Sequence, residues 1–180
     1  DDKKSTISDK ATLKTSKFSD TLVVDVIPSI EDKEFDYSGN ASQVKTFAKL
    51  DGIKNLTINN GTAAIKNLDN TGISQNLKIT GAANVSGSVS EALQYLEVNT
   101  GGNANATADI KVNANLKEYV GKGSGKDNIT VSGDGATVSK INTGAGDDTL
   151  TINNSGSVTT VDLGSGKDTL TVSGDGASLT

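Results

Sequence analysis

The chain contains no cysteine, histidine, methionine or tryptophan, and every one of its 17 basic residues is a lysine. A protein without cysteine and histidine has no Ser/His/Asp or Cys/His catalytic arrangement and no ordinary zinc or haem site. The lack of arginine also argues against a polysaccharide lyase, whose uronate carboxylates would want a bidentate partner. We therefore expect that the protein is not an enzyme.

Charge and hydropathy argue against two further kinds of partner. The formal net charge is -5 and the sequence pI is about 4.7, whereas proteins that bind nucleic acid need basic patches and favour arginine. No stretch approaches the roughly 18 apolar residues of a membrane-spanning helix. We expect neither nucleic-acid binding nor membrane insertion. The missing cysteines fit a secreted protein that relies on metal and strand stacking, although a cytosolic protein can lack them too.

A repeat occupies the last third of the chain, from Lys122 to Thr180. Each of its three units has a glycine-rich turn, an aspartate, and then apolar residues at alternate positions, as in a strand with one buried face. The aspartates Asp127, Asp148 and Asp168 lie 21 and 20 residues apart, and a fixed period of this kind is typical of solenoids. A second short apolar patch in each unit indicates two strands and two turns per coil. The sequence therefore predicts an all-β fold, a parallel β-solenoid of roughly 20-residue coils.

Stacking of these coils would bring the three aspartates into one column. Neighbouring coils are about 4.8 Å apart, and like charges at that distance repel by roughly 1 kcal/mol in water and by several times more at a lower effective dielectric. A hard divalent cation, held by carboxylates and by carbonyl groups of the glycine turns, would remove this repulsion. The predicted metal-binding residues are Gly123, Gly125, Asp127, Gly144, Gly146, Asp148, Gly164, Gly166 and Asp168.

These turns resemble the glycine-rich nonapeptide G-G-x-G-x-D-x-U-x, the calcium-binding repeat of RTX proteins. The match is imperfect, because Lys122, Thr143 and Leu163 replace the first glycine of the three nonapeptides. That glycine permits close approach of carbonyl groups, so its loss lowers the expected affinity. The resemblance implies an RTX-like β-roll or β-helix with Ca2+ as its cofactor. The alternative, that glycine and aspartate only make tight turns here, stays open.

The composition extends this resemblance to a class of surface proteins. Polar β-solenoids that are rich in Asn, Ser and Thr, with RTX-like turns and few aromatic residues, are similar to the secreted S-layer proteins of Gram-negative bacteria. This resemblance implies type I secretion, an extracellular location at the cell surface, and calcium-dependent self-assembly into a lattice. It also implies anchoring to lipopolysaccharide through parts outside this sequence. The alternative is an RTX calcium-folding module of a secreted adhesin, toxin or enzyme.

Composition and motif spacing predict three segments. Residues 1–50 form an N-terminal linking or capping segment with one hydrophobic strand, residues 51–120 form degenerate metal-free coils, and residues 121–180 form RTX-like calcium-binding coils that are truncated at the C-terminal end. The degenerate coils lack the turn aspartate but keep L-x-I or L-x-V motifs that resemble the repeat. From Leu96 to Ile129 the spacing is 33 residues. We expect one enlarged coil there, with Leu116 to Val120 as an insertion.

The N-terminal segment and the C-terminal end carry separate expectations. Thr21 to Ile27 is the most hydrophobic run and precedes Pro28, the only proline, which predicts a strand. Ser42 to Leu50 has apolar residues three apart after a capping serine, so it is either a short capping helix or an irregular strand. Thr180 falls inside what would be the second strand of a coil. We therefore expect the chain to be a fragment of a longer protein.

The turns at the other end of the coils are weaker candidates for metal. Asp134 and the equivalent acid two coils later are separated by a coil that offers Ser155, whereas a calcium column needs adjacent acids. We expect no calcium at this end. Beside the predicted sites, Lys126, Asp147 and Lys167 alternate in sign, which predicts a small ion-pair ladder worth about 0 to 1 kcal/mol per exposed pair.

Overall fold

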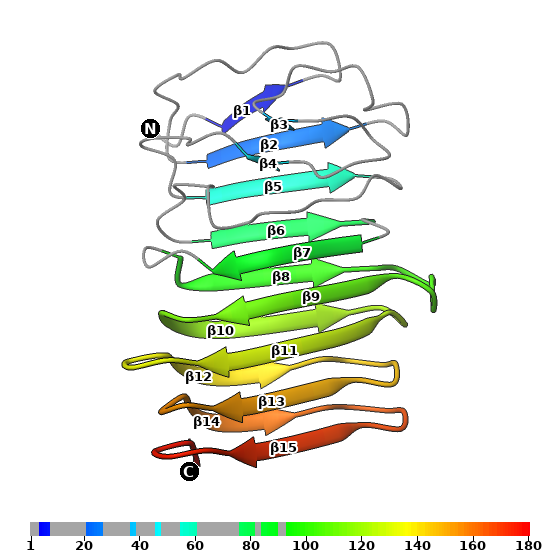
Figure 1. The fold of residues 1–180 in the computed structure, drawn as a ribbon. Helices are drawn as coiled ribbons and strands as arrows, with labels where there is room; N and C mark the ends of the chain where they lie inside the picture. Colours follow the sequence, from blue (N-terminus) through cyan, green and yellow to red (C-terminus); the bar gives the residue numbers. More distant parts are fainter. Residues whose placement is uncertain are drawn as a thin grey trace.

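The computed structural model describes residues 4–7, 21–26, 37–38, 46–47, 55–60, 76–81, 84–89 and 93–180. Within these residues the chain forms β-strands and no helix. The strands wind into a parallel β-solenoid, and equivalent residues of successive coils are about 21 residues apart. Figure 1 shows the strands stacked one above another, from β1 at one end of the molecule to β15 at the other. The predicted fold class is confirmed.

Two parallel sheets form the two walls of the solenoid, and from β7 onward each coil adds one strand to each wall (Figure 1). The nine-stranded sheet contains β1 (Lys4–Ile7), β2 (Thr21–Val26), β5 (Asn55–Asn60), β6 (Asn76–Thr80), β8 (Tyr95–Asn99), β10 (Asn115–Lys122), β12 (Thr137–Asn142), β14 (Ser157–Asp162) and β16 (Ser178–Leu179), in that order. The five-stranded sheet contains β7 (Asn84–Val89), β9 (Thr107–Val112), β11 (Lys126–Ser132), β13 (Thr149–Asn153) and β15 (Thr169–Ser173). A separate antiparallel pair consists of β3 (Tyr37–Ser38) and β4 (Thr46–Phe47).

The core is the thin layer between the two sheets. Parallel pairing places equivalent apolar residues of successive coils directly beside one another. Two such rows are Leu96, Tyr119 and Ile141 in the nine-stranded sheet, and Ile110, Ile129 and Leu150 in the five-stranded sheet. All six side chains are at most 1% exposed. Each coil therefore buries the apolar edges of its neighbours, which no single coil can do alone.

A β-bulge in β10 sets which of its side chains enter the core. The backbone N–H groups of Lys117 and Glu118 both donate to the carbonyl of Gln94, at 2.9 and 3.1 Å. Two residues thus oppose one, which turns the strand and places Leu116 and Tyr119, three positions apart, on the same inward side. The same three-residue spacing of inward side chains recurs in β12.

The prediction of an enlarged coil between Leu96 and Ile129 is wrong. Leu116 to Val120 is part of β10, a regular member of the nine-stranded sheet that pairs with both β8 and β12. Leu96 lies in the nine-stranded sheet and Ile129 in the five-stranded sheet, so their 33-residue spacing is about one and a half coils. The motif L-T-I-N-N occurs at Leu56 in one sheet and at Leu150 in the other. Strands that bury alternate apolar residues occur in both walls, for example β6 and β13, so the motif alone does not tell the walls apart.

Parallel pairing extends into the N-terminal segment. The strand predicted at Thr21 to Ile27 is confirmed as β2, which pairs with β5, while β1 pairs with β2. The helix considered for Ser42 to Leu50 is wrong at Thr46–Phe47, which forms β4, and the strand alternative is confirmed there. A β-branched residue beside an aromatic one favours extended structure. The remainder of that predicted helix lies outside the described residues.

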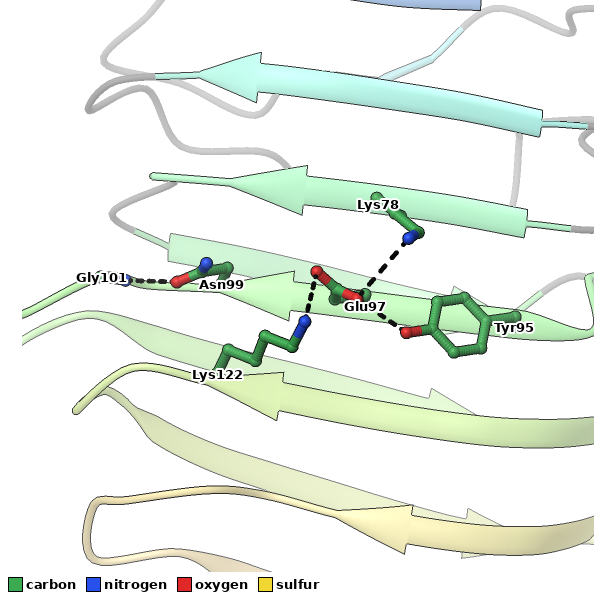
Figure 2. A network of polar contacts seen from close by, with 6 residues as sticks. All are labelled: Lys78, Tyr95, Glu97, Asn99, Gly101 and Lys122. Carbon is green, nitrogen blue, oxygen red and sulfur yellow. Dashed lines mark hydrogen bonds and ion pairs between the residues drawn. The ribbon is translucent and has the colours of Figure 1, made fainter. Parts of the chain in front are cut away.

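A polar network lies on the outer surface of the nine-stranded sheet, across β6, β8 and β10 (Figure 2). Glu97 is only 8% exposed. Its carboxylate accepts a 2.7 Å hydrogen bond from the Tyr95 hydroxyl and lies 3.2 Å from Lys122 Nζ and 3.9 Å from Lys78 Nζ. The Lys78 ammonium also lies 5.6 Å from the centroid of the Tyr95 ring, within cation–π range. Burial alone would raise the pKa of Glu97, but the Tyr95 hydrogen bond and the two lysines together lower it.

Glu97→Gln is expected to lower the free energy of unfolding by about 1 kcal/mol, because it removes the negative charge that two lysines and a tyrosine share. Urea unfolding at low salt measures the loss, which should shrink in about 1 M salt. Glu118→Gln is the matched control, since it breaks a single pair with Lys140 on the same surface, at 2.9 Å. An equal loss of free energy of unfolding in both variants would show that the Glu97 network adds no more stability than a single ion pair.

Candidate metal centre

The glycine turns stack at one end of the solenoid, at the right in Figure 1, where strands of the nine-stranded sheet pass into the five-stranded sheet. The turns are so close that a side chain has no room. A Cβ atom at Gly146 would overlap the carbonyl oxygen of Gly125, and one at Gly166 would overlap that of Gly146. Ser165 donates its N–H to the Gly144 carbonyl and accepts from the Gly146 N–H, both at 2.9 Å. Carbonyl oxygens of one turn therefore point along the stack toward the next turn.

The first of these turns stacks on a different neighbour. A Cβ atom at Gly123 would overlap the carbonyl oxygen of Gly101, and the Gly125 N–H donates to Thr100 Oγ1 at 3.0 Å. The Thr100 hydroxyl in turn donates to the Lys122 carbonyl at 3.2 Å. The turn that contains Thr100 and Gly101 thus offers a threonine hydroxyl at the position where the later turns offer glycine backbone. All six predicted glycines, Gly123, Gly125, Gly144, Gly146, Gly164 and Gly166, lie in the stack.

The three predicted aspartates form one column along the same edge. Asp148 Oδ1 accepts the Asp127 N–H at 2.8 Å, and Asp168 Oδ1 accepts the Asp148 N–H at 3.0 Å. Each carboxylate therefore reaches the backbone of the preceding coil. Asp127 and Asp148 are 2% and 1% exposed, and Asp168 is half-buried. In β9 the position beside Asp127 is Ala108, so the column has no acid above Asp127.

The second oxygens of the two buried carboxylates have no hydrogen-bond partner. Asp127 Oδ2 lies over Gly121, in the space that a Cβ atom would fill, and the carbonyl oxygen of Thr143 approaches the same space. The missing side chain at Gly121 thus leaves a cradle in which a carboxylate oxygen and a carbonyl oxygen converge. Two buried, unpaired carboxylate oxygens are costly unless a proton or a cation neutralises them.

Burial perturbs the ionisation of both acids. It raises the pKa of Asp127 to about 7, against the effect of the Tyr119 hydroxyl and with a further rise from Asp148. Burial also raises the pKa of Asp148, while the Asp127 N–H that Asp148 Oδ1 accepts acts in the opposite direction. A carboxylate in this condition favours a bound proton or a bound cation over a bare charge.

Without a divalent cation, the free energy of unfolding is expected to fall as pH rises from about 4 to about 7. The pKa of folded Asp127, about 7, exceeds the ordinary value of 3.8, so in this window the folded chain binds more protons than the unfolded chain. The contribution is fully present below the unfolded pKa and is lost as pH rises through the folded one. Urea unfolding in a chelator across this window measures the slope. Asp127→Asn should flatten it, and an unchanged slope in that variant would contradict the assignment.

The oxygens that converge at this candidate site come from carboxylates and a backbone carbonyl, which are ligand types that Ca2+ takes. Among the described residues, no three Asp, Glu, His or Cys side chains lie together as a metal cluster, so a cation here would take one or two carboxylates together with backbone oxygens. Ca2+ accepts such mixed oxygen ligands in flexible geometry, whereas Mg2+ demands a near-ideal octahedron. We call the space between Asp127 and Asp148 the first gap of the column, and the space between Asp148 and Asp168 the second gap. In the first gap, Ca2+ would be held by Asp127, Asp148 and the Thr143 carbonyl. In the second gap, it would be held by Asp148 and Asp168.

The neighbouring charged residues behave as a weak surface ladder. Lys126 Nζ lies 3.9 Å from Asp147 Oδ2, which confirms one pair of the predicted ladder. Lys167 joins it through its backbone, since its N–H donates to Asp147 Oδ1 at 3.0 Å. These groups are exposed and therefore contribute little to stability.

At the opposite end of the coils, Asp134 is exposed on a groove of about 400 Å³ that Asn113 also lines.

Sequence analysis missed three residues that lie at this candidate site, namely Gly121, Thr143 and Tyr119. Gly121 lies just before Lys122, the residue that interrupts the first nonapeptide, and an additional glycine at that point was the available signal. Thr143 was interpreted only as a substituted glycine, although its backbone carbonyl is what reaches the cradle. Tyr119 gave no signal, because its proximity to Asp127 depends on how the two sheets face each other across the core.

The sequence matches no known protein family, and neither a curated protein nor a solved structure shows significant similarity to the chain. In the described part of the chain, no helix is long and apolar enough to cross a membrane.

Proposed function

We propose that the protein is a structural component of an S-layer-like bacterial surface assembly, and that its β-solenoid is stabilised by Ca2+ in the aspartate column. The observation that carries the proposal is the pair of buried carboxylates whose second oxygens have no partner. A bound cation would offset the cost of burying these unpaired carboxylate oxygens. An aspartate that only shapes a turn has its oxygens in water or hydrogen-bonded to backbone N–H groups.

Calcium would couple export to folding in this proposal. In cytosol with little calcium the buried acids repel and the C-terminal coils are destabilised, whereas millimolar calcium outside the cell neutralises them. For a site with a dissociation constant near 10⁻⁴ M, 1 mM calcium adds about 1.4 kcal/mol. The two gaps between Asp127, Asp148 and Asp168 would together add roughly 3 kcal/mol, which is enough to decide the fate of a marginally stable domain.

The assembly part of the proposal rests on the walls of the solenoid. Both sheets present polar outer surfaces, and hydrogen bonds run between coils on them, such as Thr137 Oγ1 to Asn115 Oδ1 at 2.6 Å and Asn128 Nδ2 to Asp109 Oδ1 at 2.6 Å. A second copy of the chain is the partner that the proposal assigns to these walls. Secretion, the cell-surface location and anchoring to lipopolysaccharide belong to the same proposal, as does the absence of enzymatic activity.

Thermal unfolding by circular dichroism, with light scattering on the same samples, tests the proposal in 1 mM calcium, 1 mM magnesium and a chelator. A higher melting temperature with calcium alone, together with calcium-dependent assemblies, is the expected result. Higher melting without assembly would replace the surface-layer role by that of a calcium-folding module of a secreted adhesin, toxin or enzyme. No calcium effect on melting would overturn both and leave the turns purely structural.

A further inference from the structure

Tyr119 lies inside the core, close to the space over Gly121 that Asp127 Oδ2 enters. Tyr119 and Gly121 are alternate residues of β10, and both lie on its inward side. The side chain of Asp127 crosses from β11 in the opposite wall and ends over Gly121. Tyr119 is 0% exposed and is the largest fully buried side chain in the described part of the chain. The phenol and the carboxylate therefore share one enclosed space between the two sheets.

The polar ends of these two side chains are unsatisfied. The Tyr119 hydroxyl and Asp127 Oδ2 are both buried, and neither has a hydrogen-bond partner in the structure. A tyrosine phenol has an ordinary pKa of about 10, so it keeps its proton at neutral pH and can act as a donor. A carboxylate oxygen that accepts one hydrogen bond retains a lone pair for a cation.

The tyrosine is also specific to one coil. Parallel register places Leu96 beside Tyr119 in the coil above and Ile141 in the coil below. The coil above contributes Ala108, not an acid, next to Asp127. Tyr119 therefore lies at the N-terminal end of the aspartate column, at the coil where the acids begin.

We propose that Tyr119 is the positioning residue of the first cation gap. In this role its phenol would donate to Asp127 Oδ2 when the cation is bound and would hold that carboxylate over the Gly121 cradle, in line with Asp148 in the next coil. This inference rests on the proposed binding of Ca2+ in the column. Tyr119 acts through Asp127, so its loss should weaken the first gap and leave the gap between Asp148 and Asp168 intact.

Terbium luminescence tests this placement directly. Tb3+ replaces Ca2+ at oxygen sites and emits strongly when a tyrosine close to it is excited, and the chain has three tyrosines and no tryptophan. The variant Tyr37→Phe/Tyr95→Phe keeps Tyr119 as its sole tyrosine and should retain the sensitised emission. Tyr119→Phe keeps the buried ring but should lose the emission. Calorimetry with Ca2+ should show about a tenfold weaker first site in Tyr119→Phe and an unchanged second site.

The outcomes separate this inference from the proposed function. Emission that survives in Tyr119→Phe, or calcium binding by the unmodified protein without any tyrosine-sensitised emission, would overturn the role of Tyr119 and leave calcium binding in place. The absence of both calcium heat and terbium emission in the unmodified protein would overturn the proposed function, and the positioning role with it. Circular dichroism of each variant confirms that the fold is retained, and Tyr95→Phe alone controls for loss of a tyrosine outside the core.

Discussion

Asp148→Asn is expected to abolish most of the calcium stabilisation and, in a chelator, to make the protein more stable than the unmodified chain. Asp148 is the middle acid and contributes to both gaps, so a neutral amide removes a ligand charge from each. The expected loss is most of the roughly 3 kcal/mol that two sites would add in 1 mM calcium. The amide oxygen can still accept the Asp127 N–H, which Asp148 Oδ1 now accepts at 2.8 Å.

The opposite effect in a chelator follows from burial. Asp148 is 1% exposed and its pKa is raised, so its charge costs stability when no cation is present. Removing that charge should stabilise the calcium-free protein at neutral pH by roughly 1 kcal/mol or more. The two stability curves should therefore cross as calcium is added.

Urea unfolding of both chains over a calcium titration measures this crossing. Asp134→Asn is the matched control, because Asp134 is an exposed aspartate in a glycine turn at the other end of the coils. It should leave the calcium dependence unchanged. An Asp148→Asn protein that gains as much stability from calcium as the unmodified chain would remove the aspartate column from the proposed function.

Gly164→Ala is expected to cost about 3 kcal/mol or more, even without metal. Gly164 has φ of 76°, which alanine adopts at a cost of about 1 to 2 kcal/mol. In addition, the new methyl group would overlap the carbonyl oxygen of Gly144 in the preceding turn. Such overpacking against backbone typically costs a further 1 to 3 kcal/mol, since the two turns can separate only by breaking the hydrogen bonds at Ser165.

Gly135→Ala separates the two terms. Gly135 has almost the same φ, 79°, but nothing lies within 4 Å of the added methyl group. It should therefore show the conformational cost alone, about 2 kcal/mol less than Gly164→Ala. Urea unfolding of the two variants in a chelator measures the difference. Equal losses would mean that the turns are not stacked as closely as described and that their glycines serve only the turn conformation.

Much of the architecture is already determined by the sequence. The near-constant spacing of Asp127, Asp148 and Asp168 defines the coil, and alternate apolar residues define strands with one buried side. The glycines of the turns and the aspartate column follow from the same period. These features could be predicted because each depends only on residues close together in the chain, repeated at a regular interval.

Only the tertiary structure decided which wall each strand joins and what the acids face. The motif at Leu56 and at Leu150 is the same, yet the two copies lie in opposite sheets. Strands with alternate buried residues occur in both walls, such as β6 and β13, so this motif carries no label for either wall. The proximity of Asp127 to Gly121 and Tyr119 likewise depends on two strands that face each other across the core. Contacts of this kind are set by the register of the stack and by a bulge in β10, and neither follows from the period of the repeat.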